Sequence, residues 1–158
     1  MAATYIPAGD DTEKEIKNLK YWVVDDFGVK NLKFLPFKAA LYSVDTVTGR
    51  PGEKVYESAV IKKGDNKKWT VIDIASQHIK MPKEGIFIVF EILDVSDYKQ
   101  QFVMAKFGTI DAVPALRAKV FEPNNPHKSY YIRDIKDYEG EQYWQFMCCH
   151  FMMEAGFK

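Results

Sequence analysis

The sequence of 158 residues is long enough to bury a core of its own, and its composition, 47% hydrophobic and 28% charged, is that of an ordinary globular domain. Its 22 Lys and Arg residues balance its 22 Asp and Glu residues, so the chain lacks the basic excess that nucleic-acid-binding proteins usually need. Aromatic residues make up 15% of the chain, and because aromatic side chains suit a half-buried pleated surface, this share favours strands over helices.

The first residues are polar and rich in turn formers, which predicts a flexible lead-in over residues 1–15. Residues 1–7 also lack the basic and apolar regions of a signal peptide. A period-2 alternation then predicts a strand over residues 16–25. One face of that strand carries Leu19, Tyr21 and Val23, and the other carries Lys20, Trp22 and Val24.

Further short apolar runs follow, separated by polar turns such as residues 25–28, 45–52 and 62–68. Residues 86–93 are apolar on both faces except at Glu91, which is typical of a central strand covered on both sides. The other predicted strands cover residues 34–44, 54–61, 69–74, 102–107, 114–121, 129–132 and 144–157.

About nine short strands with a turn roughly every ten residues predict an all-β fold. We expect a single domain over residues 16–158, built as a two-sheet antiparallel sandwich of the jelly-roll kind. The sequence contains no run of about 18 apolar residues, so we expect no transmembrane helix.

A metal site is the first chemical hypothesis, because Cys148, Cys149 and His150 are adjacent. In a strand, Cys148 and His150 share a face that Cys149 opposes, so at most two ligands converge, and a disulfide between the cysteines is geometrically poor. Free cysteines are commonly buried. We therefore expect no metal and no cofactor.

Catalytic patterns give no better match. No serine lies in a Gly-x-Ser-x-Gly elbow, and the isolated glycines form no phosphate loop. The carboxylate pairs Asp25–Asp26 and Asp94–Asp97 fall in predicted turns, where Asp is favoured for local hydrogen bonding. We therefore expect no enzyme; a hydrolase would need a pocket with paired carboxylates or a His-paired nucleophile.

The aromatic residues are the feature with a functional alternative. On a sandwich they could form a stacking platform for sugar rings, although such residues more often pack within the core or on a sheet face. The candidate ligand-binding residues are Trp22, Trp69, Trp144, Tyr130 and Tyr131.

Four runs in this order resemble a known family. They are PFKAALYSVD at residues 36–45, GRPG at 49–52, KKWTVIDI at 67–74 and IKMPKEGIFIVFE at 79–91. The pattern resembles a β-sandwich region that follows the carboxypeptidase-like regulatory domain in envelope proteins of some Gram-negative bacteria. The resemblance covers about residues 34–93 and implies no peptidase activity and no catalytic residue. It implies an exported or outer-membrane location.

The sequence thus predicts a non-catalytic interaction or structural module of a bacterial cell-envelope protein or assembly. We expect a partner protein, with a glycan as an alternative ligand and no nucleic acid. The runner-up is a carbohydrate-binding β-sandwich module, which would need solvent-facing aromatic side chains. We expect a location in the cell envelope, at the periplasmic face or outer membrane, or secretion; a cytoplasmic location stays open.

Overall fold

The computed structural model of this chain describes residues 1–98, 102–106, 108–120, 122, 124, 128–132 and 143–158. Its strands are β1 (Ala2–Ile6), β2 (Ile16–Tyr21), β3 (Val23–Val24), β4 (Phe37–Val44), β5 (Pro51–Glu57), β6 (Thr70–Asp73), β7 (Ile86–Ile92), β8 (Phe102–Ala105), β9 (Gly108–Asp111), β10 (Ala115–Leu116), β11 (Ala118–Val120), β12 (Ser129–Tyr131), β13 (Gln145–Met147), β14 (Cys149–Phe151) and β15 (Met153–Phe157). The helices of the described part are short 3-10 turns: η1 (Gly9–Asp11), η2 (Leu32–Phe34), η3 (Ala75–Gln77) and η4 (Val95–Asp97).

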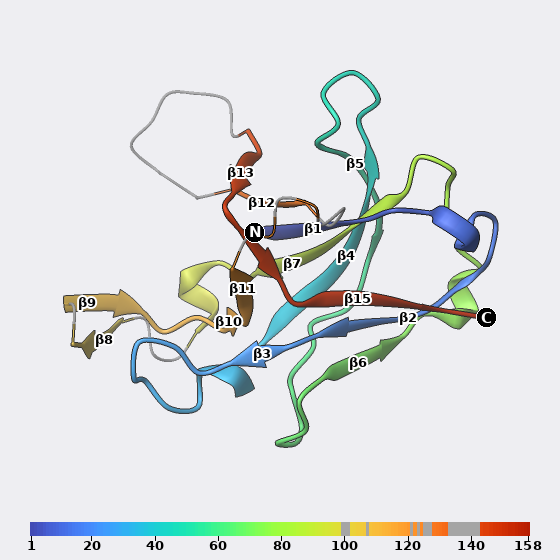
Figure 1. The fold of residues 1–158 in the computed structure, drawn as a ribbon. Coiled ribbons are helices and arrows are strands. Elements are labelled where there is room, and N and C mark those ends of the chain that lie inside the picture. The colour runs from blue at the N-terminus through green and yellow to red at the C-terminus, as the bar shows by residue number, and fades with distance from the viewer. Residues whose placement is uncertain (99–101, 107, 121, 123, 125–127, 133–142) are drawn as a thin grey trace.

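Two antiparallel sheets form the body of the molecule (Figure 1). The larger has six strands in the order β13-β12-β1-β7-β4-β5, and the smaller has three in the order β15-β2-β6. The chain crosses repeatedly between them, from β1 to β2, from β2 to β4 and from β5 to β6. The prediction of an all-β, two-sheet antiparallel sandwich is therefore confirmed.

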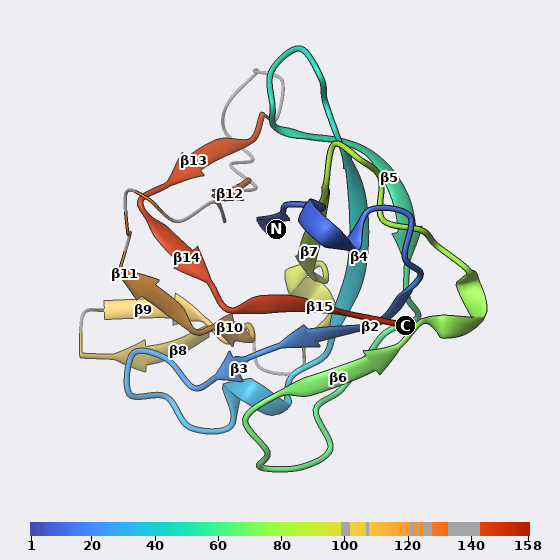
Figure 2. The same ribbon diagram turned by 45° about the vertical axis from the view of Figure 1, so that its right-hand side comes forward.

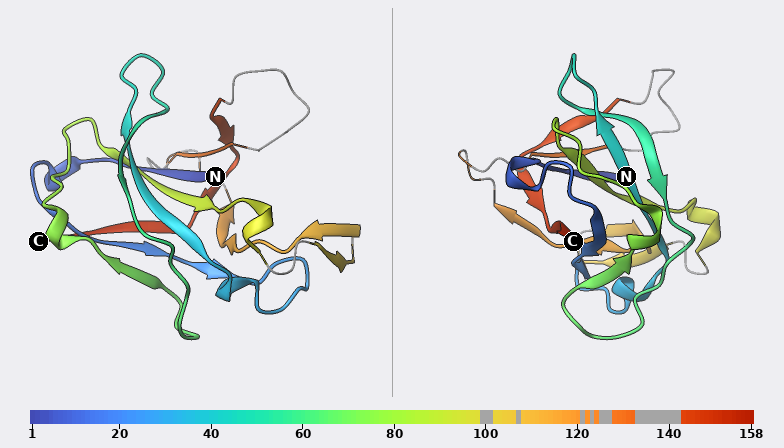
Figure 3. Two further views of the ribbon diagram at one scale, coloured as in Figure 1. Left: turned by 180° about the vertical axis from the view of Figure 1, so that it is seen from behind. Right: turned by 90° about the vertical axis from the view of Figure 1, so that its right-hand side faces the viewer.

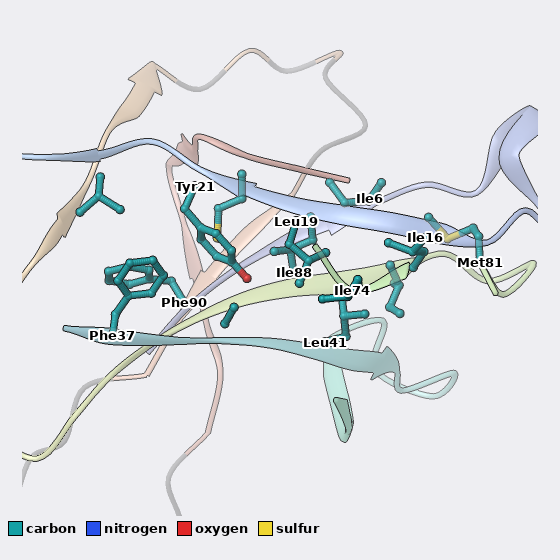
Figure 4. Close-up of a cluster of buried hydrophobic side chains, with 14 of the residues drawn as sticks. Ile6, Ile16, Leu19, Tyr21, Phe37, Leu41, Ile74, Met81, Ile88 and Phe90 are labelled. Atoms are coloured by element: carbon teal, nitrogen blue, oxygen red, sulfur yellow. The ribbon is translucent and has the colours of Figure 1, made fainter. Parts of the chain in front are cut away.

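The main core lies between the two sheets. Figure 4 shows Leu19 and Tyr21 of β2 facing Leu41 of β4 and Phe90 of β7. These four side chains are at most 2% exposed. Tyr21 also donates a hydrogen bond of 3.1 Å from its hydroxyl to the backbone oxygen of Val89, which satisfies its buried polar atom.

The outer face of the larger sheet carries a second apolar cluster. Alternate residues of β7 divide between the clusters: Ile88 and Phe90 face the main core, while Phe87 and Val89 belong to the second. The second cluster consists of Ala3, Ala40, Phe87, Val89, Tyr130 and Trp144. The prediction that residues 86–93 form a central strand covered on both faces is confirmed for β7.

The expectation of a flexible lead-in over residues 1–15 is wrong. Strand β1 lies inside the larger sheet, between β12 and β7, with Ala3 paired to Val89 and fully buried. Further along, the backbone N–H of Glu13 donates to the oxygen of Met81 at 2.9 Å. The sequence does not predict this strand because five residues are too few to show a clear period. The polar turn residues that follow it also favour a loop.

The C-terminal run, residues 144–157, is not one strand. It is divided into β13, β14 and β15, which pair with β12, β11 and β2 respectively (Figure 2). The run thereby passes from the edge of the larger sheet to the edge of the smaller one. Where it crosses the inner side of β1 and β12, the hydroxyls of Thr4 and Ser129 bond the backbone of Phe151 at 3.2 Å and 3.1 Å.

The lysine-rich segment at residues 62–68, predicted as a polar turn, does not close a hairpin. The strands on its two sides, β5 and β6, belong to different sheets, and the connection runs down the outside of the molecule between them (Figure 3). Lys63 is only 6% exposed and donates to the backbone oxygen of Lys68 at 3.3 Å. Burial lowers the pKa of its amine.

A paired substitution tests the placement of β1. We expect Ala3→Glu to lower the free energy of unfolding by more than about 3 kcal/mol, because it puts an unpaired carboxylate in a fully buried position. Val47→Glu introduces the same side chain at a loop position that is 92% exposed, and we expect little change. Urea unfolding of both variants measures the difference; equal stabilities would restore the flexible lead-in.

Candidate functional site

The structure divides the five candidate aromatic residues between two places. Trp144 and Tyr130 are 9% and 8% exposed and pack in the second cluster, where Trp144 contacts Tyr42 with ring centroids 6.0 Å apart. Tyr131 lies on β12, partly exposed. Trp22 and Trp69 lie together in a separate place, directly after β2 and directly before β6. The five residues therefore do not form one platform.

The pairing of β2 with β6 explains why Trp22 and Trp69 meet. Lys20 pairs with Val71 and Tyr21 with Thr70, so the next pair in this register would be Trp22 and Trp69. Because Tyr21 faces the core, alternation turns Trp22 to the outer face of the sheet. The two indole rings have centroids 5.9 Å apart and are tilted by 53°, and both side chains are partly exposed.

Two cations lie against these rings. The amine of Lys68 is 4.1 Å from the Trp22 ring centroid and 5.4 Å from that of Trp69, while the guanidinium of Arg117 is 6.0 Å from the Trp22 centroid. These distances are in the range of cation–π attraction. We call Trp22, Trp69, Lys68 and Arg117 the Trp–cation surface.

A junction of three strand pairs positions this surface. Trp22, Arg117 and Met152 lie between β2 and β3, between β10 and β11, and between β14 and β15. Their backbones form a closed ring of hydrogen bonds: Trp22 donates to Met152 at 3.0 Å, Met152 to Arg117 at 2.8 Å, and Arg117 to Trp22 at 2.9 Å. Trp22 and Arg117 are thus held side by side by backbone bonds.

The outer face of the larger sheet carries a different polar group, on β4, β5 and β7. The Tyr42 hydroxyl donates to Glu91 at 2.9 Å, and the Lys54 amine lies 3.0 Å from a Glu91 oxygen. Lys54 also bonds Glu57, which accepts from Lys38 at 2.7 Å. We call these five residues the carboxylate–lysine network.

Three residues of this network, Tyr42, Glu57 and Lys54, have pKa values shifted further from neutral pH. Burial and the hydrogen bond to Glu91 raise the pKa of Tyr42 to about 12. Hydrogen bonds from Lys38 and then Lys54 lower the pKa of Glu57 to about 2. For Lys54, burial favours the neutral amine, but the bonds to Glu57 and Glu91 outweigh it and raise the pKa. Glu57 and Lys54 therefore stay charged, and Tyr42 stays neutral, at neutral pH.

An open groove of about 540 Å³ lies beside the network. Its charged lining residues are Lys38, Lys62, Glu91, Asp94 and Asp97. Asp94, singled out as half of a carboxylate pair, accepts bonds from the backbone and hydroxyl of Ser96 at 2.9 Å and 2.7 Å. This is the local turn hydrogen bonding that its position predicted.

The three adjacent thiol and imidazole residues are spread over different environments. Cys148 is exposed, Cys149 is partly buried and His150 is 5% exposed. Burial raises the pKa of the Cys149 thiol, which disfavours the thiolate that a metal binds. Within the residues that the structure describes, no group of three or more His, Cys, Asp or Glu side chains is placed to hold a metal. That the protein binds no metal stays a prediction.

Comparisons with known proteins add no further identification. No protein-family model matches the sequence, and neither a curated protein nor a solved structure does. Among the described residues, no helix is long and apolar enough to cross a membrane.

The candidates from the sequence include Trp22 and Trp69 but neither Lys68 nor Arg117. Arg117 was never a candidate, because its contact with Trp22 joins residues 95 positions apart through the strand junction. Lys68 falls in the predicted polar turn at residues 62–68. Its position directly before Trp69, at the start of a predicted strand, is the signal that could have indicated a contact with the tryptophans.

The network predicts a pH-dependent stability. The pKa of Glu57 in the folded protein, about 2, is below its ordinary value of 4.5, so its ionised form stabilises the fold above pH 4.5 and this contribution is lost as the pH falls through 2. We expect Glu57→Gln to melt below the wild type near neutral pH, with the difference shrinking between these values. Glu53→Gln, an exposed control, should show no such trend by circular dichroism. A difference independent of pH would contradict this role of Glu57.

Proposed function

We propose that this chain is a non-catalytic binding module of a bacterial cell-envelope assembly, and that it binds a partner protein through the outer face of its three-stranded sheet. The observation that carries the proposal is the Trp–cation surface. Two indole rings and two cations lie together there, with both rings partly exposed, at the end of the β2–β6 register.

The composition of this surface supports a binding role. Trp and Arg are the residues most enriched among those that dominate the binding energy of protein interfaces. The hydrogen-bond ring and the sheet register hold Trp22 and Arg117 in place before a partner arrives, which reduces the entropy lost on binding. The site is thus preorganised.

The carboxylate–lysine network supports the non-catalytic part of the proposal. A general acid or base works best when its pKa lies near the operating pH. The pKa values of Tyr42 and Glu57 are instead shifted away from neutral pH, to about 12 and about 2. The network is therefore suited to fixing β4, β5 and β7 together rather than to moving protons.

The envelope location rests on the resemblance of residues 36–45, 49–52, 67–74 and 79–91 to an envelope-protein sandwich. In the structure these runs supply β4, β6 and β7 together with the turns beside them. They include Trp69 of the proposed surface, so the resemblance and the surface share one segment of the chain.

A carbohydrate-binding module is the second candidate, favoured by the two adjacent, partly exposed tryptophans. Sugar rings stack flat against indole faces. Here the rings are tilted by 53°, and Lys68 lies 4.1 Å over Trp22, where a sugar would stack. The geometry therefore favours a partner that contacts the cations over one that must displace them.

Substitution of the tryptophans tests the proposal. Wild type, Trp22→Ala, Trp69→Ala and the control Tyr143→Ala, an aromatic side chain 63% exposed elsewhere, are immobilised and exposed to detergent-solubilised bacterial envelopes. We expect one envelope protein to bind wild type and control, and each Trp variant to lose about 2 kcal/mol or more of its binding energy. Titration calorimetry with that protein, once purified, measures the loss.

Two outcomes decide between the candidates. If purified neutral polysaccharide binds wild type and not the Trp variants, and no protein does, the carbohydrate candidate replaces the proposal. If the Trp variants bind everything that the wild type binds, neither candidate stands. Thermal melts of each variant confirm that it is folded.

A further inference from the structure

We infer that the Trp–cation surface recognises the carboxylates of an acidic segment in the partner protein, with Lys68 and Arg117 as the groups that bind them. This inference rests on the proposed function and names the chemistry of the partner. It follows from how the charges of these two residues are placed.

Lys68 and Arg117 differ from nearby lysines in their partners. Lys67 lies 3.6 Å from Asp65, and Lys20 lies 3.7 Å from Glu154, so both have a carboxylate partner. In the described part of the chain, no carboxylate oxygen lies within 4.0 Å of the charged nitrogens of Lys68 or Arg117. Their close contacts are the indole rings instead.

An indole ring positions a cation without neutralising it. The ring quadrupole attracts the cation and holds it over the ring face, but it carries no net charge and leaves the positive charge in place. The same rings exclude water from one side, which strengthens electrostatic interactions on the other. Lys68 and Arg117 are therefore positioned, still charged and partly exposed.

The charged groups of Arg117 and Lys68 match carboxylates. A guanidinium offers a planar fork of donors that fits a carboxylate in two hydrogen bonds, and an ammonium offers a compact point charge. The chain has no net charge, so a general field would not draw an acidic partner to it. Recognition would depend on this local pair of cations.

An exposed aliphatic side chain on the same sheet face favours a polypeptide over a sugar acid. The next row of the same sheet face carries Val71, a side chain that is 57% exposed. An aliphatic side chain offers nothing to sugar hydroxyls, but it packs against apolar side chains. A segment that mixes acidic and apolar residues matches both Val71 and the cations.

Synthetic peptides test the inference. A peptide of alternating glutamate and leucine is titrated into the full chain, and the indole N–H signals of Trp22 and Trp69 are followed by NMR, with the buried Trp144 as internal reference. We expect the first two signals to shift, the binding to weaken with added salt, and Lys68→Gln and Arg117→Gln each to weaken it at least about fivefold. Lys67→Gln, the matched control, should bind like the wild type.

Three results would overturn the inference: no shift of either indole signal, equal binding of a glutamine–leucine peptide, or equal binding by the Lys68 and Arg117 variants. Binding of polygalacturonic acid without binding of the peptide would identify an acidic glycan instead. The envelope capture separates this failure from that of the proposed function. A partner lost in the Trp variants but kept by Lys68→Gln and Arg117→Gln would leave the binding module intact and remove only its acidic specificity.

Discussion

The ring of backbone hydrogen bonds among Trp22, Met152 and Arg117 is the constraint on which the arrangement of the strands depends. At each of these residues a strand leaves one partner and joins another, which would ordinarily leave unpaired N–H and C=O groups. Here each residue donates to one neighbour and accepts from the other, at 2.8–3.0 Å. Three strand pairs can therefore diverge from one point without losing a hydrogen bond.

The position of the Trp–cation surface follows from this junction and from the core. Tyr21 and Val23 are 0% and 2% exposed, so the residue between them must face outward. Trp69 lies beside Trp22 because both lie directly beyond the last pair of the β2–β6 register, in which Tyr21 pairs with Thr70. Moving Trp22 to another orientation would require a register slip, which would expose the buried side chains of β2. The packing that stabilises the sandwich thus also fixes the surface.

Local pattern and non-local pairing explain what could be predicted from the sequence. The alternation over residues 16–25 gave the correct two faces of β2 and β3, and the apolar run at residues 86–93 gave a strand covered on both sides, because both signals are local. Strand β1 and the division of the C-terminal run depend on pairings that are not local, and two of them, Tyr130 opposite Ala3 and Met153 opposite Tyr21, join residues more than a hundred positions apart. The five aromatic candidates can be picked out by residue type, but which of them meet depends on the fold, which brings Trp22 and Trp69 together and buries Trp144.

The carboxylate–lysine network and the Trp–cation surface use lysines in opposite ways. In the carboxylate–lysine network, Lys38 and Lys54 bond Glu57 and Glu91, so the charges cancel within the fold and contribute to its stability. At the Trp–cation surface the partner of the cation is an uncharged ring, so the fold positions the charge without cancelling it. A charge held by a neutral aromatic ring keeps most of its capacity to attract an anion from outside. The physical difference between the two groups is therefore the charge of the partner, which suits one group to stabilising the fold and the other to the recognition that we propose.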